Sequence, residues 1–350
     1  MLKARLVQRL EGSDPIPFEE FMALALYDEE LGYFATGPLR STTTGDFLTS
    51  PEVSPLFGET IARFVDAELE RCGGRAVVEV GSGSGSLLRP LLDGVETGVV
   101  AWAVEASAAA RAATTGAVPE ATVVARIDDL PPSLRGVVVA NEVADNLPVA
   151  LAVRRGSGWM ERFVGAADGE LVYHEVAARP EVAAWADRHA GVVPQGGQVE
   201  VQLAAGVWLR SLLDLVEAGA VVVIDYGDDA EGLARRREEG TLRTYRGHHL
   251  GPDPLLEPGG TDVTVDVAFD ALADVAATAG CQVDVTSQVE FLERWGLADR
   301  RRELREAELA AARVGETMAR LVAKSRVTEA DTLLHPRGLG AFRVLVARRG

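Results

Sequence analysis

The sequence predicts a doubly wound α/β sheet, and three observations support that prediction. Five short apolar runs recur along the chain, which is the pattern of parallel strands covered on both faces. Helical or turn segments separate most of the runs, and a glycine-rich stretch follows the first of them. The runs are AVVEV at 76–80, VAWAV at 100–104, TVVA at 122–125, GVVVAN at 136–141 and AVVVID at 220–225.

The segment before the first run is predicted to be helical. A short helix is expected over residues 1–10, and the run PFEEFMALAL at 17–26 places two Phe, a Met and an Ala on one helical face. A further helix is expected within PLFGETIARFVDAELERCGG at 55–74, with Ser50 or Ser54 as its cap and the two glycines as its end.

The chain after the fourth run alternates between polar and apolar residues and is broken by GSG and ADG turns. This pattern predicts a small antiparallel insertion, after which a helix over 201–217 leads to the fifth run. Later elements are expected to close the sheet with an antiparallel edge. They are a helix at 268–280, a strand at 281–288, a long charged helix at 299–323 and a strand at 342–349.

Composition limits the classes of partner. The chain has 35 basic and 53 acidic residues, a net charge of −18, which argues against nucleic acid and favours a cationic partner. The Arg triplets 235–237 and 300–302 are expected to be solvated. The two cysteines are far apart and lack metal-ligand spacing, so no metal site and a reducing compartment are predicted.

No apolar run approaches the roughly 20 residues that a membrane span needs. The opening MLKARLVQRL lacks the apolar core of a signal peptide, although it is basic and amphipathic, as a transit peptide would be. We therefore expect a cytoplasmic protein without membrane association. The sequence carries no signal for the oligomeric state.

The glycine-rich loop EVGSGSGS follows the first run, where Gly81, Gly83 and Gly85 permit a tight turn. A dinucleotide fingerprint needs Gly or Ala at the sixth position of its motif, and Ser86 stands there. The G-x-G-x-G spacing with Glu79 two residues ahead is typical of Rossmann-like enzymes that use S-adenosylmethionine (SAM). An NAD-dependent oxidoreductase is the alternative interpretation.

Acidic residues at the ends of later strands are candidates to bind the ribose and the adenine of such a cofactor. Glu105 ends the second run and is placed to accept hydrogen bonds from both ribose hydroxyls. Asp128 or Asp129, after the third run, could accept from the adenine amino group or simply cap a turn.

Polar groups also follow directly on the fourth run, in NEVADNLP. The backbone carbonyl near Asn141 could receive the ammonium group of the methionine moiety. Glu142 and Asp145 could face the site of methyl transfer.

With these residues in place, the chain resembles the MidA-like methyltransferases, whose mitochondrial members are complex I assembly-factor protein-arginine methyltransferases. The resemblance covers nearly the whole chain and rests on blocks in a shared order. They are PFEEFMALALYDEELGYFATG, GDFLTSPEVSPLFGE, VVEVGSGSGSLL, NEVADNLPV, VVVIDYGDD and GTLRTYRGHH.

The resemblance implies a class I methyltransferase fold and SAM as the cofactor. It also implies that the GDFLTSP block is a lid beside the cofactor cleft and that the glycine loop, Ser82 included, binds SAM. The block residues that it assigns to the SAM site are Gly45, Asp46, Thr49, Ser50 and Pro51. The chain departs from the family where Ser82 replaces a proline and where VADN at 143–146 replaces an aromatic followed by Asp-Ala.

The function predicted on this basis is methyl transfer from SAM to arginine in a protein substrate. A guanidinium needs a carboxylate to hold it as a fork, and Glu142 and Asp145 are the predicted catalytic residues, with Glu52 in reserve. An assembly or scaffold protein with little or no catalysis is the alternative from another class.

The chain is expected to have four segments. Residues 1–75 form a helical segment that includes the lid block, and residues 76–148 form the first half of the Rossmann-like core. Residues 149–200 form a β-rich substrate region, and residues 201–350 supply the second half of the core and the closing elements.

Overall fold

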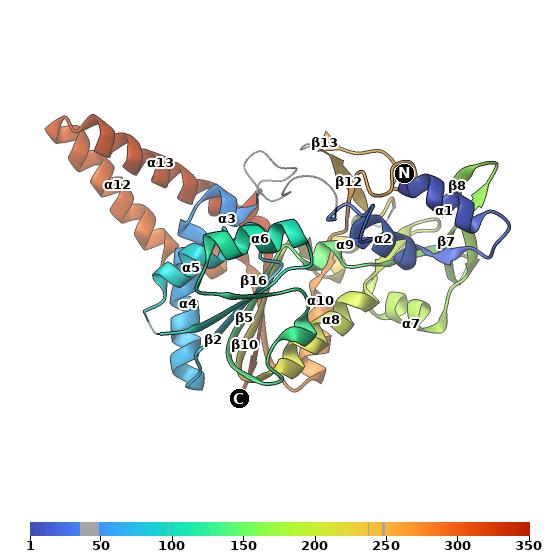
Figure 1. Cartoon of the computed structure of the whole chain (residues 1–350), viewed down its shortest axis with the longest axis horizontal. Coiled ribbons are helices and arrows are strands. Elements are labelled where there is room, and N and C mark those ends of the chain that lie inside the picture. Colours follow the sequence, from blue (N-terminus) through green and yellow to red (C-terminus); the bar gives the residue numbers. More distant parts are fainter. Residues whose placement is uncertain (36–48, 97, 237, 247–248) are drawn as a thin grey trace. The chain divides into compact units, whose positions relative to one another are not determined.

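The computed structural model describes residues 1–35, 49–96, 98–236, 238–246 and 249–350 (Figure 1). The chain divides into two compact units, each made of three stretches of sequence. The sheet unit consists of Ser41–Asn141, Asp214–Ile224 and Cys281–Gly350, and the second unit consists of Met1–Arg40, Glu142–Leu213 and Asp225–Gly280. The four-segment division expected from the sequence remains a prediction.

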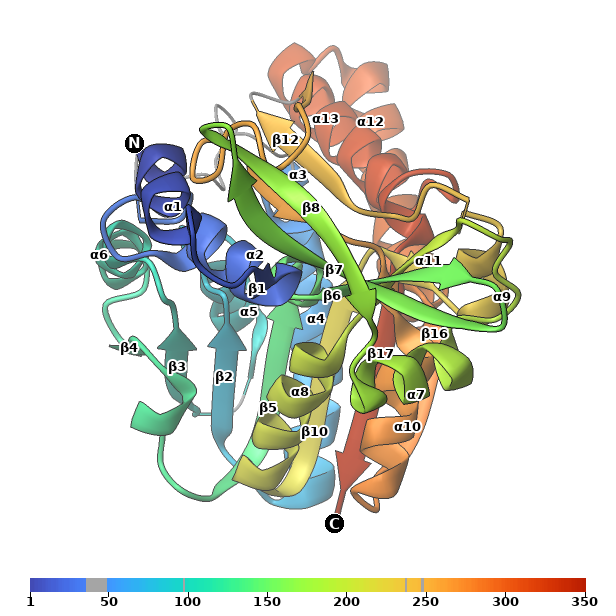
Figure 2. The same cartoon turned by 90° about the vertical axis from the view of Figure 1, so that its right-hand side faces the viewer.

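A seven-stranded sheet dominates the sheet unit, in the order β16-β17-β10-β5-β2-β3-β4. The strands are β2 Ala76–Val80, β3 Val100–Val104, β4 Thr122–Val124, β5 Leu134–Asn141, β10 Val216–Asp225, β16 Gln282–Ser287 and β17 Arg343–Arg349. The pairs β2–β3, β2–β5, β3–β4 and β5–β10 are parallel, and β16–β17 is antiparallel. Figure 2 shows β17 running opposite to β2, β3 and β5. The predicted doubly wound sheet with an antiparallel closing edge is confirmed.

Helices of the sheet unit supply the rest of its core. They are α3 Ser50–Val53, α4 Leu56–Cys72, α5 Leu88–Gly94, α6 Ala108–Ala117, α11 Gln288–Arg294, α12 Leu297–Val314 and α13 Thr317–Leu333, with short 3-10 turns η1 Ile127–Asp129 and η3 Leu339–Ala341. Phe57 and Phe64 of α4 pack in one hydrophobic cluster with Val77, Val139 and Phe291. The continuous apolar strands are therefore covered, as their composition predicts.

The single long helix predicted over 299–323 is wrong, because two helices stand there. Gly315 adopts a left-handed conformation with φ of 78° and ends α12. Glycine is the residue that takes this conformation without steric cost, and the charged residues around it conceal the break. The result is a helical hairpin, α12–α13.

The second unit contains the remaining helices and strands. Its helices are α1 Leu2–Leu10, α2 Phe18–Tyr27, α7 Pro180–His189, α9 Ala230–Ala234, α10 Phe269–Thr278 and most of α8 Leu203–Leu215, with the 3-10 turn η2 Ala144–Asn146. Its strands are β1 Ile16–Pro17, β6 Ala150–Arg155, β7 Gly158–Ala167, β8 Glu170–Ala177, β9 Gln198–Val201, β11 Gly227–Asp228, β12 Arg243–Arg246, β13 His249–Leu250, β14 Asp262–Thr264 and β15 Val267–Ala268.

An antiparallel sheet forms the body of the second unit and confirms the predicted insertion. Its order is β1-β7-β6-β9, with β8 paired to β7. Phe18, Phe21 and Met22 of α2 pack in one cluster with Leu151 and Val164 of the sheet. The apolar helical face predicted for residues 17–26 is therefore the face that α2 buries.

One Arg triplet that was expected to be solvated lies in the second unit. Arg235 and Arg236 are exposed, as predicted, and the guanidinium of Arg236 also forms an ion pair with the buried Asp266. A buried carboxylate needs such a partner, which sequence spacing does not reveal. Arg237 lies outside the described residues.

Among the residues that the structure describes, no helix combines the length and the apolar character that crossing a membrane requires.

Two glycines allow the central strands to approach each other closely. A Cβ atom on Gly219 of β10 would lie 1.8 Å from the carbonyl oxygen of Gly136 in β5, and a Cβ on Gly136 would lie 1.9 Å from the carbonyl oxygen of Ala76 in β2. Because the obstructing atoms are backbone atoms of paired strands, they cannot rotate away as a side chain would.

We expect Gly219→Ala to destabilise the protein by about 2 kcal/mol or more, because the added methyl group must push β10 and β5 apart. Gly116→Ala is the matched control, since a Cβ there meets no atom within 4 Å and Gly116 lies inside α6. The control should leave stability unchanged or raise it by up to about 1 kcal/mol. Denaturant unfolding of the three proteins checks this, and equal midpoints for Gly219→Ala and the unmutated protein would contradict it.

Candidate active site

The glycine loop of the sheet unit folds as a tight turn after β2. Gly81, Gly83 and Gly85 have φ values of 75°, 52° and 81°. The Gly81 N–H donates to the carbonyl of Val104 at 2.8 Å, and the Gly85 N–H donates to the carbonyl of Ser82 at 2.8 Å. The three glycines therefore occupy conformations that side chains disfavour, as the predicted turn requires.

Glu105 at the end of β3 binds this loop directly. Its carboxylate accepts a hydrogen bond from the Gly83 N–H at 2.9 Å and another from the Ser107 N–H at 2.8 Å. Each carboxylate oxygen has a further lone pair, so Glu105 can still accept bonds from two hydroxyl groups of a ligand. This geometry agrees with the ribose-binding role predicted for Glu105.

Thr114 of α6 ties the loop to its neighbouring helix. Its hydroxyl donates to the Gly83 carbonyl at 3.0 Å and lies 3.0 Å from the Ser82 hydroxyl. Ser82 is buried, and its hydroxyl is bonded within the chain. Sequence reasoning did not find Thr114, because nothing in a helix composed mainly of Ala and Thr indicates which threonine faces the loop.

Glu79 lies inside β2 and is buried. Burial raises the pKa of its carboxyl group well above the usual range, and the charge of Glu105 raises it further. Its Oε2 atom has no hydrogen-bond partner in the part of the chain that the structure describes. A buried carboxyl oxygen without a hydrogen-bond partner, two residues before the glycine loop, fits a polar ligand at this position.

The block that precedes α4 is only partly described. Gly45 and Asp46 lie outside the described residues. Ser50 is fully buried, and its hydroxyl accepts a hydrogen bond from Gln288 of α11 at 3.2 Å. Pro51 is also buried, and Thr49 stands directly before α3. The structure therefore places Ser50 in a contact within the sheet unit that the sequence did not indicate.

Glu52 of α3 is a titratable group with an unusual environment. Desolvation raises the pKa of its carboxyl to about 7, against a smaller lowering by the backbone N–H that binds it. Its Oε2 atom is buried and has no hydrogen-bond partner among the described residues. Glu52 thus remains a candidate for contact with a polar ligand.

Of the other predicted residues of the sheet unit, Asn141 lies beside the glycine loop, because it follows Ala140 of β5, which pairs with Val80 of β2. Asp128 is exposed and pairs with the guanidinium of Arg126, and Asp129 accepts a hydrogen bond from the Arg126 N–H at 3.1 Å. They cap an exposed turn, which was the alternative role considered for them. Asn141 is the buried last residue of β5.

In the second unit, Asp145 belongs to a cluster of acids. It is buried, and its carboxylate accepts a hydrogen bond from the hydroxyl of Tyr226. Burial raises the pKa of Asp145 to about 6, although the bond from Tyr226 lowers it. Asp145 therefore changes its charge just below neutral pH.

Asp225 at the end of β10 organises the cluster. Its carboxyl oxygens accept hydrogen bonds from the backbone N–H groups of Ala144 at 2.9 Å, Asp145 at 3.2 Å and Tyr226 at 2.9 Å. Its pKa is raised well above the usual range by burial, and further by the charges of Asp145 and Glu142. Glu142 has a φ of 52°, an uncommon left-handed conformation for a residue with a side chain.

The structure thus brings Glu142 and Asp145 together, as the sequence predicted, and adds Asp225 and Tyr226. Both added residues lie in the block VVVIDYGDD, which supported the resemblance without receiving a role. The available signal was the acid that directly follows a buried apolar run, the same signal that identified Glu105. Among the described residues, no cluster of three His, Cys, Asp or Glu side chains has the geometry to hold a metal ion.

A glycine loop bound by a strand-end carboxylate on a mostly parallel α/β sheet is the arrangement of Rossmann-like proteins that bind a ribose-containing cofactor. Residues 60–287 match the family described as "Putative S-adenosyl-L-methionine-dependent methyltransferase". The protein belongs to this family. SAM is its cofactor, and the alternative of an NAD-dependent oxidoreductase is set aside.

Solved structures agree with this family. A protein of Burkholderia thailandensis, crystallised with S-adenosyl-homocysteine bound, is 30% identical with a TM-score of 0.86, covering 99% of this chain and 92% of that chain. A second Burkholderia thailandensis crystal structure, of a protein described as uncharacterized, is 31% identical with a TM-score of 0.85, covering 99% and 91%. The predicted fold, the predicted methyltransferase activity and the predicted cofactor are confirmed.

Curated relatives extend the comparison and confirm the predicted resemblance. Protein arginine methyltransferase NDUFAF7, mitochondrial, of Danio rerio is 27% identical over 339 residues, covering 84% of this chain and 76% of the relative. The Drosophila melanogaster homolog of the same name is 27% identical over 334 residues, covering 84% and 74%.

The mitochondrial names of these relatives contradict the cytoplasmic location predicted from the sequence. That prediction relied on the missing apolar core of a signal peptide. This criterion detects secretory signals and does not detect amphipathic transit segments.

We expect Glu105→Gln to weaken SAM binding about 10- to 100-fold, the cost of losing one charge-assisted hydrogen bond of about 1.5–3 kcal/mol. Titration calorimetry with SAM measures the change. Glu120→Gln is the control, because Glu120 is an exposed acid of the same unit that pairs with Arg89. Unchanged affinity for Glu105→Gln would remove Glu105 from the cofactor site.

Proposed function

We propose that the protein transfers a methyl group from SAM to the guanidinium of an arginine in a protein substrate. The observation that carries the proposal is the buried cluster in which Asp145 is bonded to Tyr226 and stands beside Glu142 and Asp225. Carboxylates held in fixed orientation are the groups that bind a guanidinium as a two-pronged fork.

The cofactor supplies an electrophilic methyl group on a sulfonium, so the protein mainly has to hold and align its acceptor. We assign the holding of SAM to the glycine loop residues Gly81 to Gly85, with Glu105 for the ribose and Glu79 below the loop. Gly45, Asp46, Thr49, Ser50, Pro51, Asp128, Asp129 and Asn141 remain predictions for the same site.

Each member of the acidic cluster has a separate role in holding the acceptor. Asp145 and Glu142 supply negative charge to the guanidinium, and Glu52 remains in reserve. The Tyr226 hydroxyl fixes the orientation of the Asp145 carboxylate. Asp225 binds the backbone of residues 144–145 and so positions Asp145. Transfer of the methyl group from the sulfonium to a guanidinium nitrogen would break the carbon–sulfur bond, release the neutral thioether and displace one N–H proton to solvent, so the methylated guanidinium would keep its positive charge.

The relatives support arginine as the acceptor, because their names describe protein arginine methyltransferases. The net charge of −18 is consistent with a basic acceptor. A scaffold role without catalysis is favoured by two observations, namely Ser82 in place of the family's proline and VADN at 143–146 in place of its usual motif.

Purified protein with labelled SAM should produce methylarginine in lysate from cells that lack the gene, measured by mass spectrometry after hydrolysis. Asp145→Asn should lower the rate about 100-fold, or about 2.7 kcal/mol, while changing the Kd for SAM less than threefold. SAM binding without methyl transfer would favour the scaffold role. Methyllysine as the sole product would exclude arginine, and equal losses of rate and affinity in Asp145→Asn would move Asp145 to the cofactor site.

The pH dependence of the rate tests Tyr226. Because Asp145 has a pKa of about 6 and must be ionised to hold a guanidinium, we expect the rate at saturating SAM to rise with pH between about 5 and 7. The hydrogen bond from Tyr226 stabilises the charged form and lowers this pKa, so Tyr226→Phe should shift the rising limb to higher pH. Tyr245→Phe, a tyrosine of β12, is the control. A limb that stays in place in Tyr226→Phe would contradict the role of Tyr226.

A further inference from the structure

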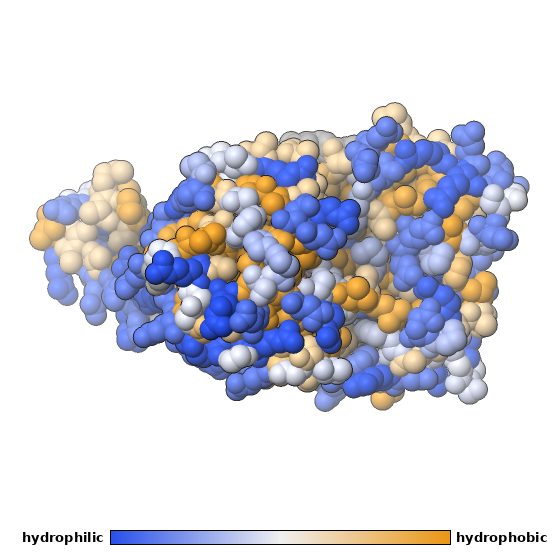
Figure 3. Space-filling model, turned by 60° about the horizontal axis from the view of Figure 1, so that its bottom comes forward, coloured by the Kyte–Doolittle hydropathy of each residue, from blue (hydrophilic) through white to orange (hydrophobic). Residues whose placement is uncertain are grey.

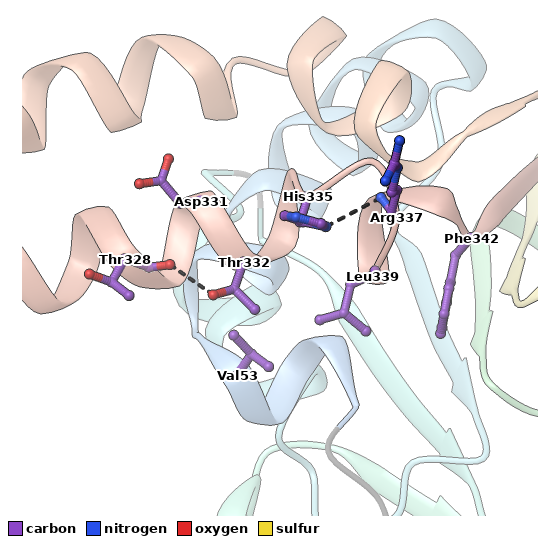
Figure 4. Close-up of a pocket in the computed structure, with 9 residues that line it drawn as sticks. Val53, Thr328, Asp331, Thr332, His335, Arg337, Leu339 and Phe342 are labelled. Atoms are coloured by element: carbon purple, nitrogen blue, oxygen red, sulfur yellow. Dashed lines mark hydrogen bonds between the residues drawn. The ribbon is translucent and has the colours of Figure 1, made fainter.

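Two features of the sheet unit suit apolar contacts and do not explain how a guanidinium would be held. The free end of the α12–α13 hairpin exposes apolar side chains, among them Met318 and Val322 (Figure 3). A cavity of about 710 Å³ has Leu339 and Phe342 among its walls (Figure 4), and the carboxylate in its lining, Asp331, is already paired with an arginine of α12. The orientation of an acceptor therefore depends on the acidic cluster of the second unit.

The turn η2, which carries Asp145, is too short to hold its own shape. It contains the three residues Ala144–Asn146, and a long hydrogen bond of 3.3 Å from the Leu147 N–H to the Ala144 carbonyl closes it. A single turn of helix fixes more of the backbone than its own hydrogen bonds repay. The conformation of η2 is therefore set by groups from other segments of the chain.

Three segments that are distant in sequence bind the backbone of η2. Asp225, at the end of β10, accepts hydrogen bonds from two of its N–H groups. The Val265 N–H donates to the Asp145 carbonyl at 3.0 Å. The Tyr27 hydroxyl, from the end of α2, donates to the Asn146 carbonyl at 3.2 Å. These bonds satisfy backbone groups that such a short turn cannot satisfy itself.

The side chain of Asn146 adds a two-point contact to this backbone network. Its Nδ2 atom donates to Asp262 Oδ1 at 2.9 Å and to the Val263 carbonyl at 3.2 Å. An amide nitrogen carries two hydrogens, so both of them are used on neighbouring residues of β14. Asp262 and Val263 are buried, so removing the amide would take a donor away from two buried acceptors.

The strand that Asn146 binds is held in turn by the block GTLRTYRGHH. Part of this block forms β12, which pairs antiparallel with β14. Just after β14, the Asp266 N–H donates to the Thr241 hydroxyl at 3.2 Å, and the Asp266 carboxylate pairs with Arg243 at 3.0 Å. A block that supported the resemblance without receiving a role therefore supports the strand to which η2 is attached.

The carboxylate of Asp145 is the group whose direction depends on η2. One of its oxygens accepts a hydrogen bond from Tyr226, while the other, Oδ1, is buried and has no hydrogen-bond partner among the described residues. A buried oxygen of this kind is costly unless a donor from a ligand reaches it. Because a guanidinium presents its N–H groups in a rigid fork, the direction of the carboxylate decides whether Oδ1 can accept from it.

We propose that Asn146 is a positioning residue for the methyl acceptor, because its side-chain amide fastens the turn that carries Asp145 to β14. The inference rests on the proposed function, in which Asp145 holds the guanidinium. Asn146 does not contact the substrate in this arrangement. Asp225 fixes the N–H groups of the turn and Asn146 fixes its last residue, and together they direct Asp145 Oδ1 toward the acceptor.

The apparent KM for the acceptor tests this role, with lysate protein from cells that lack the gene as the probe at saturating labelled SAM. Asn146→Ala should raise this KM about tenfold and change the Kd for SAM less than threefold, because only the direction of Asp145 is lost. Asn146→Leu keeps the branched shape but has no N–H group, so it should raise the KM as Asn146→Ala does. A lower fraction of folded protein would reduce the rate without raising the KM.

Gln195→Ala is the matched control, because Gln195 is also a side-chain amide of the second unit with two hydrogen bonds. Its Nε2 donates to the Gly156 carbonyl at 2.7 Å, and its Oε1 accepts from the Gly156 N–H at 2.9 Å. This variant should keep the unmutated KM. An unchanged KM in Asn146→Ala, a normal KM in Asn146→Leu, or equal effects of Asn146→Ala and Gln195→Ala would overturn the proposal.

Amide hydrogen exchange tests the attachment of η2 without any methyl transfer. The N–H groups of Ala144, Asp145 and Val265 are hydrogen-bonded in this arrangement, so Asn146→Ala should speed their exchange at least tenfold and Gln195→Ala should not. Unchanged exchange would overturn the inference even where methylarginine is formed. Faster exchange in Asn146→Ala, with no methylarginine from the unmutated protein, would overturn the proposed function, and the acceptor role of Asn146 with it.

Discussion

A carboxyl group at the end of a strand that binds the backbone of the next loop is the interaction on which both candidate sites depend. Glu105 accepts hydrogen bonds from Gly83 and Ser107, and Asp225 accepts them from residues 144–145 and from Tyr226. Loops of glycine or of small polar residues have no apolar core to fix their shape. A buried or half-buried carboxyl that gathers several N–H groups supplies that shape, because leaving it unsatisfied would be costly.

The same arrangement sets the electrostatics of each site. Burial and neighbouring acids raise the pKa values of Glu79 and Asp225 well above their usual range, and burial raises the pKa of Asp145 to about 6. A cation bound beside such acids would favour their charged forms. Glu142 has a left-handed backbone conformation, which costs energy in a residue with a side chain. Such conformations persist where the surrounding contacts hold the backbone in place, and they are common at functional sites.

The sequence predicted those features of the fold and of the site that a local pattern of residues determines. Buried parallel strands must be apolar on both faces, so β2, β3 and β5 were identified within a few residues, and acids directly after such runs identified Glu105 and Asp145. Contacts between distant segments were not predictable in this way. Ser50 binds Gln288 across 238 positions of sequence, and Thr114 was one threonine among similar residues. The break at Gly315 was hidden in a charged stretch whose pattern continues on both sides.

The hairpin shows why charge alone misleads about a surface. The Arg triplet at 300–302 was expected to be solvated, and each of its members pairs with an acid: Arg300 with Glu303, Arg301 with Asp331 and Arg302 with Asp299. These exposed pairs contribute little to stability, but they neutralise one another and leave no basic patch there for a partner. The hairpin also exposes large apolar side chains, namely Leu309, Val314, Met318, Leu321 and Val322. Their exposure to water is unfavourable, so charge alone does not describe the surface of this hairpin.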